Sequence, residues 1–148
     1  LNLHSQKISN HVVTLAKQKR VRQIMRIFQK KIIRQHHRIC CEGRDQASTI
    51  LKKNPRYDVA FYFKCNLNTA SLRRWLDLKK KVSLKEVKKS LRTRTLLDKK
   101  RHHNPLKKMV DAVLIRTDIL NKKAVIAKMS KEIDKKLISK YGRNFKAR

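Results

Sequence analysis

The residues with the clearest chemical potential are two histidines and two cysteines that fall within six positions. His36, His37, Cys40 and Cys41 include histidine–cysteine pairs four residues apart, which a helix would place on one face as potential metal ligands. A structural zinc site usually needs four ligands in paired short spacings, and no Cys-x-x-Cys or His-x-x-x-His pair occurs elsewhere. A surface histidine pair beside ordinary thiols is therefore favoured, and no metal site is predicted.

The acidic residues give little support for catalysis. They are isolated and flanked by bases, and Glu132 and Asp134, two positions apart, diverge on a helix. Gly43 and Gly142 are the only glycines, so the sequence holds no Gly-rich phosphate loop. A Cys–His dyad stays open, although nothing distinguishes Cys65 from a core residue. We therefore expect neither an enzyme nor a bound cofactor.

Basic residues form the most regular pattern in the sequence. The first 41 residues contain no aspartate or glutamate, and five cations within them are spaced four apart. On a helix this spacing makes like charges neighbours, and each pair costs ~0.2–0.5 kcal/mol in the free chain. A polyanion lying along the helix would reverse that cost, because each cation could then neutralise a phosphate. This cation ladder consists of Arg22, Arg26, Lys30, Arg34 and Arg38.

The overall charge extends this prediction to the whole chain. There are 41 lysines and arginines against 10 acidic residues among 148, a net charge of +31, and every segment is basic. Such a density indicates nucleic acid, and charge on all sides is typical of a protein embedded in folded RNA. Aromatic residues make up only 5%, which argues against a base-stacking platform. The residues predicted to contact RNA are Lys19, Arg20, Arg22, Arg26, Lys30, Lys31, Arg34, Arg38, Lys79, Lys80, Lys81, Lys99, Lys100, Arg101, Lys107, Lys108, Arg143, Lys146 and Arg148.

Helices are expected to present these cations. From about residue 10 to residue 41, apolar residues recur at steps of three, four or seven, which predicts one long helix, with a break at residues 17–20 left open. Its apolar stripe and its cation ladder lie on different faces. Gly43 then acts as a C-cap, and Asp45 caps a short helix that ends before Pro55.

Cap signals mark two helices in the middle of the chain. Asn68 or Thr69 caps a helix that the lysines at 79–81 terminate. Ser83 and Glu86 have the spacing of a capping box, in which each side chain bonds to the backbone of the other, and they open the next helix.

The clearest break in the sequence is at residues 102–105. Asn104 is expected to cap a helix with Pro105 at its first position, extending to about Leu120. A last helix then ends at Gly142. Whether these two helices form a hairpin or one rod stays open.

Residues 57–65 are ambiguous. Val59, Phe61 and Phe63 alternate as in a strand, whereas Val59, Phe63 and Leu67 would form a helical face. We favour a helix, because no second strand is evident to pair with this segment.

These patterns predict an all-α fold. It is an extended array of about five or six amphipathic helices with basic terminal arms and a small core, ordered mainly by its partner. The expected organisation is a basic N-terminal helix or arm at 1–42, a small central helical region at 43–103, and a C-terminal helical region with a basic tail at 104–148.

The favoured function is that of a structural RNA-binding protein in a large ribonucleoprotein, namely a ribosomal protein that contacts rRNA phosphates and neighbouring proteins. A DNA-compacting or viral nucleoprotein is the alternative, followed by a basic amphipathic binder of membrane surfaces or acidic partners. The acid-free, hydroxyl-containing start resembles a mitochondrial presequence in composition, so the mitochondrial matrix is the expected compartment, with the cytosolic ribosome or the nucleus as alternatives. No transmembrane segment is expected.

Overall fold

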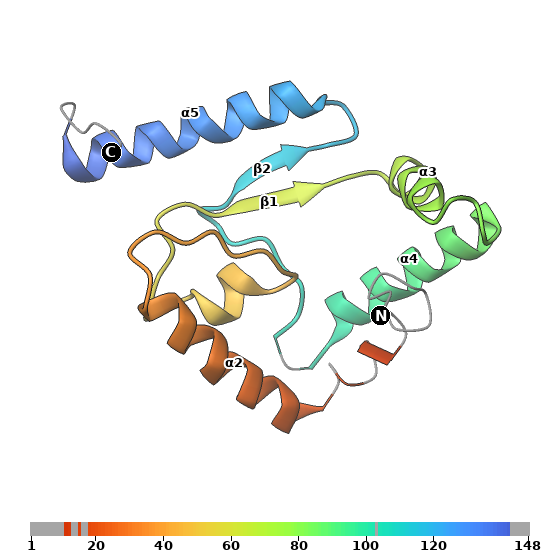
Figure 1. Cartoon of the computed structure of the whole chain (residues 1–148), viewed down its shortest axis with the longest axis horizontal. Helices are drawn as coiled ribbons and strands as arrows, with labels where there is room; N and C mark the ends of the chain where they lie inside the picture. The colour runs from red at the N-terminus through yellow and green to blue at the C-terminus, as the bar shows by residue number, and fades with distance from the viewer. Residues whose placement is uncertain (1–10, 13–14, 16–17, 103, 143–148) are drawn as a thin grey trace.

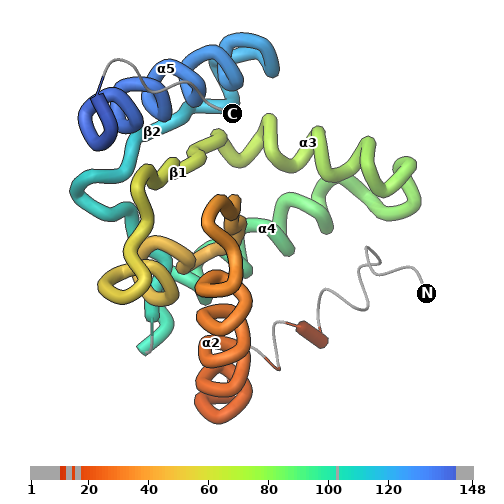
Figure 2. The backbone as a smooth tube through the Cα atoms, turned by 60° about the vertical axis from the view of Figure 1, so that its left-hand side comes forward, coloured from red at the N-terminus to blue at the C-terminus, as the bar shows by residue number. Residues whose placement is uncertain are grey.

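The computed structural model describes residues 11–12, 15, 18–102 and 104–142. Two parallel strands lie between the helix of residues 122–141 on one side and the helix of residues 19–34, with a π-helical turn, on the other (Figures 1 and 2). The helices of residues 67–77 and 84–100 extend from one end of the sheet. The elements are α2 (Lys19–Arg34), the π-helix η1 (Gln46–Ile50), β1 (Phe61–Lys64), α3 (Leu67–Asp77), α4 (Leu84–Lys100), β2 (Val113–Arg116) and α5 (Lys122–Tyr141).

The sheet shows that the all-α prediction is wrong. β1 pairs with β2 in parallel, with Phe61 opposite Val113 and Lys64 opposite Arg116. A parallel pair needs a long crossover connection, and α3 and α4 supply it here. The backbone N–H of Thr117 donates to the carbonyl of Lys64, which lies 53 positions away in the sequence. The segment at 57–65 was predicted to be a helix because its partner strand lies too far along the sequence to be recognised.

Few apolar side chains are fully enclosed. Ile115, in the centre of β2, has no exposed surface, and Val87 of α4 is 3% exposed. The other buried apolar residues among those described are Ile33, Ile50, Ala60 and Ala112. The core thus joins the sheet, η1, the end of α2 and the start of α4.

Local cap signals placed several helix ends correctly. Ser83 and Glu86 form the predicted capping box, and α4 begins directly after it. α3 begins after Asn66, whose side chain accepts a hydrogen bond from the N–H of Thr69, so the expected cap lies two or three residues too late. α3 and α4 pack against each other.

The C-terminal region differs from the prediction in its first half. Residues 105–112 are not helical and β2 follows them, so neither a hairpin of helices nor one rod forms. Asn121 caps α5 by accepting from the N–H of Ala124, and Gly142 ends the helix with φ of 84°. The side-chain ammonium of Lys128 donates to the carbonyl of Leu114, which joins α5 to β2.

The first helix is shorter than predicted. α2 begins after Gln18, so the break near residues 17–20 is real, but the helix ends at Arg34 instead of continuing to residue 41. Gly43 consequently caps no helix, whereas Asp45 does precede the short helical segment η1. None of the described helices combines the length and the apolar character that crossing a bilayer requires.

Candidate anion site

The N-terminal half of α2 meets two segments that are distant from it in sequence. One is formed by the residues just before η1, and the other is the end of α4 with the loop that follows it. Arg22 of α2 forms an ion pair with Asp45. Arg44, next to that aspartate, donates from Nε to the carboxylate of Asp98 at 2.7 Å. The site is therefore assembled by ion pairs that cross the fold.

Asp98 is the centre of a charged cluster. Its carboxylate lies 2.7 Å from Arg44 and 3.5 Å from Arg101, which is three residues further along the chain. The side chains of Asp98 and Arg101 are only 14% and 16% exposed. The backbone carbonyl of Asp98 also accepts from the N–H of Leu106 at 2.8 Å, which turns the loop back toward the sheet. One aspartate thus holds two guanidinium groups in a partly buried position.

Several donors in this cluster have no acceptor. Nε and Nη2 of Arg101, and Nε of Arg22, are buried and lack a hydrogen-bond partner among the described residues. An unsatisfied buried N–H costs ~1–3 kcal/mol, and more when it is charged, so such groups are rare in a finished structure. These nitrogens are donors that the described residues leave without an acceptor.

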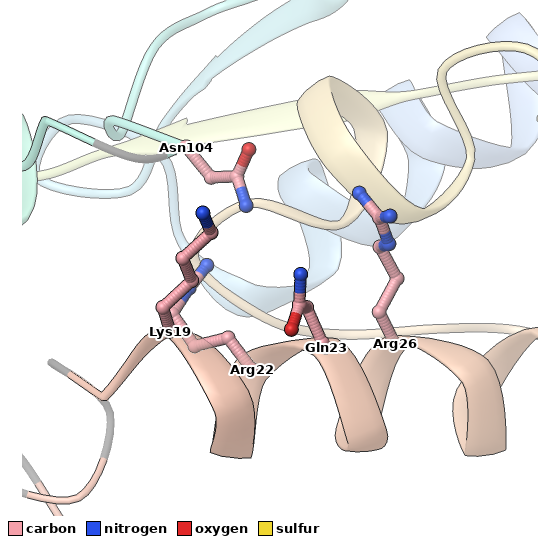
Figure 3. Close-up of a pocket in the computed structure, with 5 residues that line it drawn as sticks. All are labelled: Lys19, Arg22, Gln23, Arg26 and Asn104. Carbon is pink, nitrogen blue, oxygen red and sulfur yellow. The ribbon is translucent and has the colours of Figure 1, made fainter.

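A cavity of about 140 Å³ opens along α2, with Arg22 among the residues that line it (Figure 3). One water molecule occupies ~30 Å³ in the liquid, so the space suffices for a phosphate-sized group. α2 presents Lys19, Arg22, Gln23 and Arg26 to the cavity, and Asn104 faces them from the loop after α4. Three cations and two amides line it, without a carboxylate, so its chemistry favours an anion.

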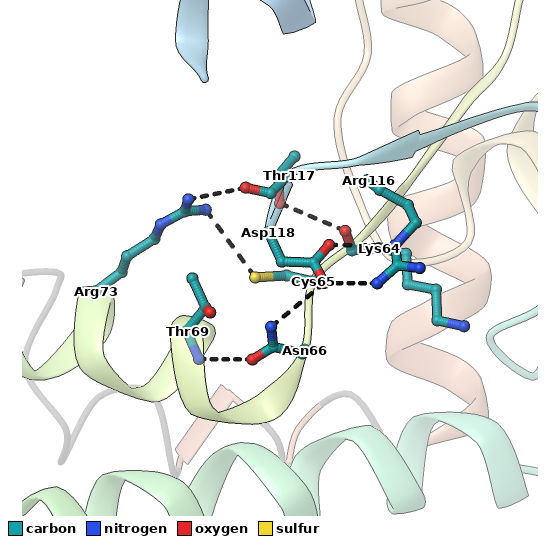
Figure 4. Close-up of polar contacts among 8 residues, drawn as sticks. All are labelled: Lys64, Cys65, Asn66, Thr69, Arg73, Arg116, Thr117 and Asp118. Atoms are coloured by element: carbon teal, nitrogen blue, oxygen red, sulfur yellow. Dashed lines mark hydrogen bonds and ion pairs between the residues drawn. The ribbon is translucent and has the colours of Figure 1, made fainter. Parts of the chain in front are cut away.

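A second polar cluster lies where β1 and β2 end (Figure 4). Asp118 accepts from Arg116 at 2.8 Å and from Asn66 at 3.3 Å, and the hydrogen bond from Arg116 lowers the pKa of Asp118 to about 2. Arg73 donates to the carbonyl of Thr117 at 2.8 Å. These hydrogen bonds join β1, β2 and the start of α3, so the cluster stabilises the sheet ends.

The structure gathers only part of the predicted RNA-binding set. Lys19, Arg22 and Arg26 line the cavity, and Arg101 lies in the adjoining cluster. Two cations of the ladder are engaged within the fold, because Arg22 binds Asp45 and Lys30 donates to the carbonyl of Asn54, whereas Arg26 and Arg34 are exposed. The ladder also breaks before Arg38, since α2 has already ended.

The remaining predicted cations are scattered. Lys80 lies over the ring of Trp75, 5.1 Å from its centroid. Arg143, Lys146 and Arg148 fall outside the described residues. The others lie on exposed surface away from the cavity: Arg20, Lys31, Arg34, Lys79, Lys81, Lys99, Lys100, Lys107 and Lys108.

Sequence reasoning missed four residues of the site, Arg44, Asp45, Asp98 and Asn104. They were absent from the predicted set, because the isolated acidic residues were given no role and the prediction followed clusters of bases. A usable signal was present: so few carboxylates in so basic a chain each attract specific arginines. No group of three histidine, cysteine or acidic side chains suited to a metal ion occurs in the part of the chain that the structure describes.

Comparisons with known proteins identify the fold family. A family model described as cytidylate kinase matches residues 1–135. A cytidylate kinase of Clostridium botulinum (strain Okra) is 29% identical over 131 residues, which are 86% of this chain and 58% of that protein. A cytidylate kinase of Lactobacillus gasseri is 28% identical over 137 residues, which are 90% of this chain and 58% of that protein. A bifunctional pantoate ligase/cytidylate kinase of Trichodesmium erythraeum is 33% identical over 123 residues, 80% of this chain and 22% of that protein.

These matches overturn the functional predictions made from charge. The relatives are named as kinases, so the predictions of a ribosomal RNA-binding protein, of an rRNA or DNA partner and of a chain without enzymatic function are wrong. The high net charge suggested a nucleic acid, but a high net charge is compatible with any phosphate-bearing partner. The chain spans a little over half the length of the cytidylate kinases it matches. Their P-loop nucleoside monophosphate kinase fold is α/β, in agreement with the parallel strands, and this chain belongs to the cytidylate kinase family.

Proposed function

We propose that this chain takes part in phosphoryl transfer to cytidine monophosphate and supplies the residues that bind this acceptor nucleotide. The observation that carries the proposal is the cavity lined by three cations and by Asn104, together with the buried, unpartnered nitrogens on Arg101, which precedes Asn104 by three residues. The family match supports the choice of nucleotide, because the relatives are named as cytidylate kinases.

The cavity has the charge that a nucleoside monophosphate requires. A phosphate monoester carries a charge of about −1.5 to −2 near neutral pH. Lys19 and Arg26 offset this charge, whereas Arg22, which also lines the cavity, is paired with Asp45. A guanidinium group can donate two parallel hydrogen bonds to phosphate oxygens, which fixes the orientation of the phosphate as well as its position.

The acidic residues prepare the site in two ways. Asp98 holds Arg44 and Arg101 in place before a ligand arrives, so little side-chain entropy is lost on binding. Asp45 beside Arg22 places a carboxylate acceptor next to a guanidinium donor. A carboxylate can accept from the exocyclic amine of cytosine, and a guanidinium can donate to the adjacent ring acceptors. The ion pair between Arg22 and Asp45 is thus a candidate for reading the base.

The assignment to the acceptor nucleotide follows from the glycine content. P-loop enzymes cradle the phosphates of the donor triphosphate with the backbone of a Gly-rich loop and a lysine. The two glycines of this chain are Gly43 and Gly142, which cannot form such a loop. The cationic cavity, by contrast, needs only side chains and fits a single phosphate group.

Titration calorimetry of the chain with cytidine monophosphate tests this proposal. Arg101→Gln removes the unpartnered donors and should weaken binding by roughly ten- to a hundredfold, because a hydrogen bond to a charged group contributes ~1.5–3 kcal/mol. Arg116→Gln is the matched control, since Arg116 binds Asp118 in the cluster at the strand ends. Cytidine without a phosphate should bind much more weakly than the monophosphate. Equal binding of the two ligands, or equal loss in both variants, would refute the proposal.

A further inference from the structure

Two adjacent cysteines lie in the connection between α2 and η1. Cys40 and Cys41 are both free thiols, the first exposed and the second partly buried. Residues 39–42 run without a turn or bend, so successive side chains alternate in direction as they do along a strand, which fits the unequal exposure. Neither cysteine lines the cavity, and the proposed function leaves both without a role.

The connection that carries these thiols is held at both of its ends. On one side, Ile33 in the last turn of α2 is buried. On the other side, Arg44 donates to Asp98 at 2.7 Å, and Asp45 pairs with Arg22. The two cysteines precede these ion pairs by only three to five residues. A change of the backbone path at the cysteines therefore acts on residues that the fold has fixed.

A disulfide between the two cysteines demands a different backbone. Consecutive α-carbons across a trans peptide are ~3.8 Å apart, whereas those joined by a disulfide are usually ~4.4–6.8 Å apart. The bond between Cys40 and Cys41 thus closes a small, strained ring and brings both side chains to one side, so the straight segment has to turn. Strained and exposed disulfides are the readily reduced ones, as a reversible switch requires.

The turn shortens a connection that has little slack. An extended residue spans ~3.3 Å, so a turn at two residues takes up roughly 3 Å of chain. Gly43 lies so close to Gln46 that a β-carbon on the glycine would be 2.8 Å from Nε2 of the glutamine. The shortening is as large as the 2.7 Å contact between Arg44 and Asp98, and it is sufficient to separate them.

We propose that Cys40 and Cys41 form a thiol–disulfide switch, which a low-molecular-weight disulfide oxidises and which then draws Arg44 and Asp45 away from their partners. The effect on nucleotide binding rests on the proposed function, because it requires that these ion pairs prepare the site. The thiol chemistry and its effect on the stability of the chain do not depend on the nucleotide.

The oxidation is a thiol–disulfide exchange in two steps. The Cys40 thiolate attacks one sulfur of the dissolved disulfide, forms a mixed disulfide and expels a thiolate, which takes up a proton. The Cys41 thiolate then attacks the sulfur of Cys40, closes the bond and expels the second thiolate. The cysteines lose two electrons and two protons, and the dissolved disulfide is reduced to two thiols. Cys40 is the exposed thiol and reacts first, whereas burial and the neighbouring Cys40 raise the pKa of the Cys41 thiol.

The test is oxidation of the full chain in buffers with defined ratios of reduced to oxidised glutathione. Intact-mass spectrometry should show the loss of two hydrogens, with Cys65 still open to alkylation. Oxidation should lower the melting temperature followed by circular dichroism, and dithiothreitol should restore it. Cys40→Ser and Cys41→Ser cannot close the bond, so each should melt at the same temperature in both buffers. Cys65→Ser is the matched control that keeps the switch, and two serine variants of the pair keep the test valid if one folds poorly.

Asp98→Asn tests the route of the effect. Arg44 has already lost its ion pair in this variant, so oxidation should lower the melting temperature by less than it does in the unmodified chain. Oxidation of the unmodified chain should also weaken binding of cytidine monophosphate by roughly tenfold, because a hydrogen bond to a charged group is lost.

Four results would overturn the inference. They are a mixed disulfide with glutathione that never closes, a disulfide between two chains, closure without a change in the melting temperature, and an equal decrease in the Asp98→Asn variant. If the reduced chain does not bind cytidine monophosphate while oxidation still closes the bond and lowers the melting temperature, the proposed function fails and the switch remains. If the reduced chain binds the nucleotide and the oxidised chain binds it equally well, the switch does not act on the site.

Discussion

Replacing Asp98 with asparagine should destabilise the chain through two guanidinium groups at once. Asp98→Asn keeps the shape of the side chain and removes the charge that binds Arg44 and Arg101. Because the asparagine side chain can still accept one hydrogen bond, the loss of stability is smaller than if the side chain were removed completely, as in Asp98→Ala.

The burial of the cluster determines the size of the effect. The Asp98 side chain is 14% exposed and that of Arg101 is 16%, whereas Arg44 is 40% exposed and partly screened by water. A hydrogen bond to a charged group contributes ~1.5–3 kcal/mol, and the contact with Arg44 lies at the lower end of that range. We expect a loss of ~2–3 kcal/mol in the free energy of unfolding. For a chain of this length that lowers the melting temperature by ~5–10 °C.

Thermal unfolding followed by circular dichroism measures this shift. Asp58→Asn is the matched control, because Asp58 also pairs with a cation, Lys140, at 2.7 Å, but both side chains are about half exposed or more. Exposed ion pairs contribute little, so the control should melt close to the unmodified chain. If the two variants melt at the same temperature, the charged cluster does not stabilise the fold. The same variant should also bind cytidine monophosphate less tightly, because Arg44 and Arg101 lose their common anchor.

Three further predictions concern the fold around the site. Ile115→Ala should lower the free energy of unfolding by ~2–5 kcal/mol in chemical denaturation, since Ile115 is fully buried at the centre of β2; a cost below ~1 kcal/mol would show that this core is loosely packed. Ser83→Ala removes the capping box of α4 and should cost ~1 kcal/mol in the same assay, whereas Ser83→Thr should cost less. The pKa of Asp118 is lowered from 3.8 to about 2 chiefly by the hydrogen bond from Arg116, so Asp118 contributes stability above pH 4 that is lost as the pH falls toward 2. Asp118→Asn should flatten that acid limb of the stability curve, and an unchanged limb would contradict the role of this ion pair.

The sequence alone was sufficient to locate several helix ends. Ser83 and Glu86 are three residues apart in the sequence, so their capping box could be predicted, and the structure confirms it. Gly142 stops α5 as expected, because a glycine accepts a positive φ without strain. The end of α4 at Lys100 agrees with the predicted break, although the helix expected to begin at Asn104 and Pro105 does not form. These features depend on interactions within one or two helical turns, which a linear sequence displays directly.

The strands and the orientation of α2 could not be predicted in this way. The hydrogen bonds of β1 are made to a segment more than two helices further along the chain, so the alternation at Phe61 and Phe63 had no visible partner. Periodicity correctly separated the cationic and apolar faces of α2, but it does not say which face is turned inward. Here ion pairing with Asp45 draws the cations inward, so a helix that looked suited to an external polyanion lines a cavity instead.

Charge content favoured an anionic partner, whereas only the fold shows which of the many cations lie together. The net charge of +31 is a property of composition, and it is compatible with any phosphate-bearing partner. Arg22, Arg44 and Arg101 come from three separate segments, and Asp45 and Asp98 bring them together. Local patterns do not show which carboxylate pairs with which distant cation, because the partners lie 23 and 54 positions apart in the sequence. The cavity beside α2, which includes Asn104 from the loop after α4, therefore exists only after the chain has folded.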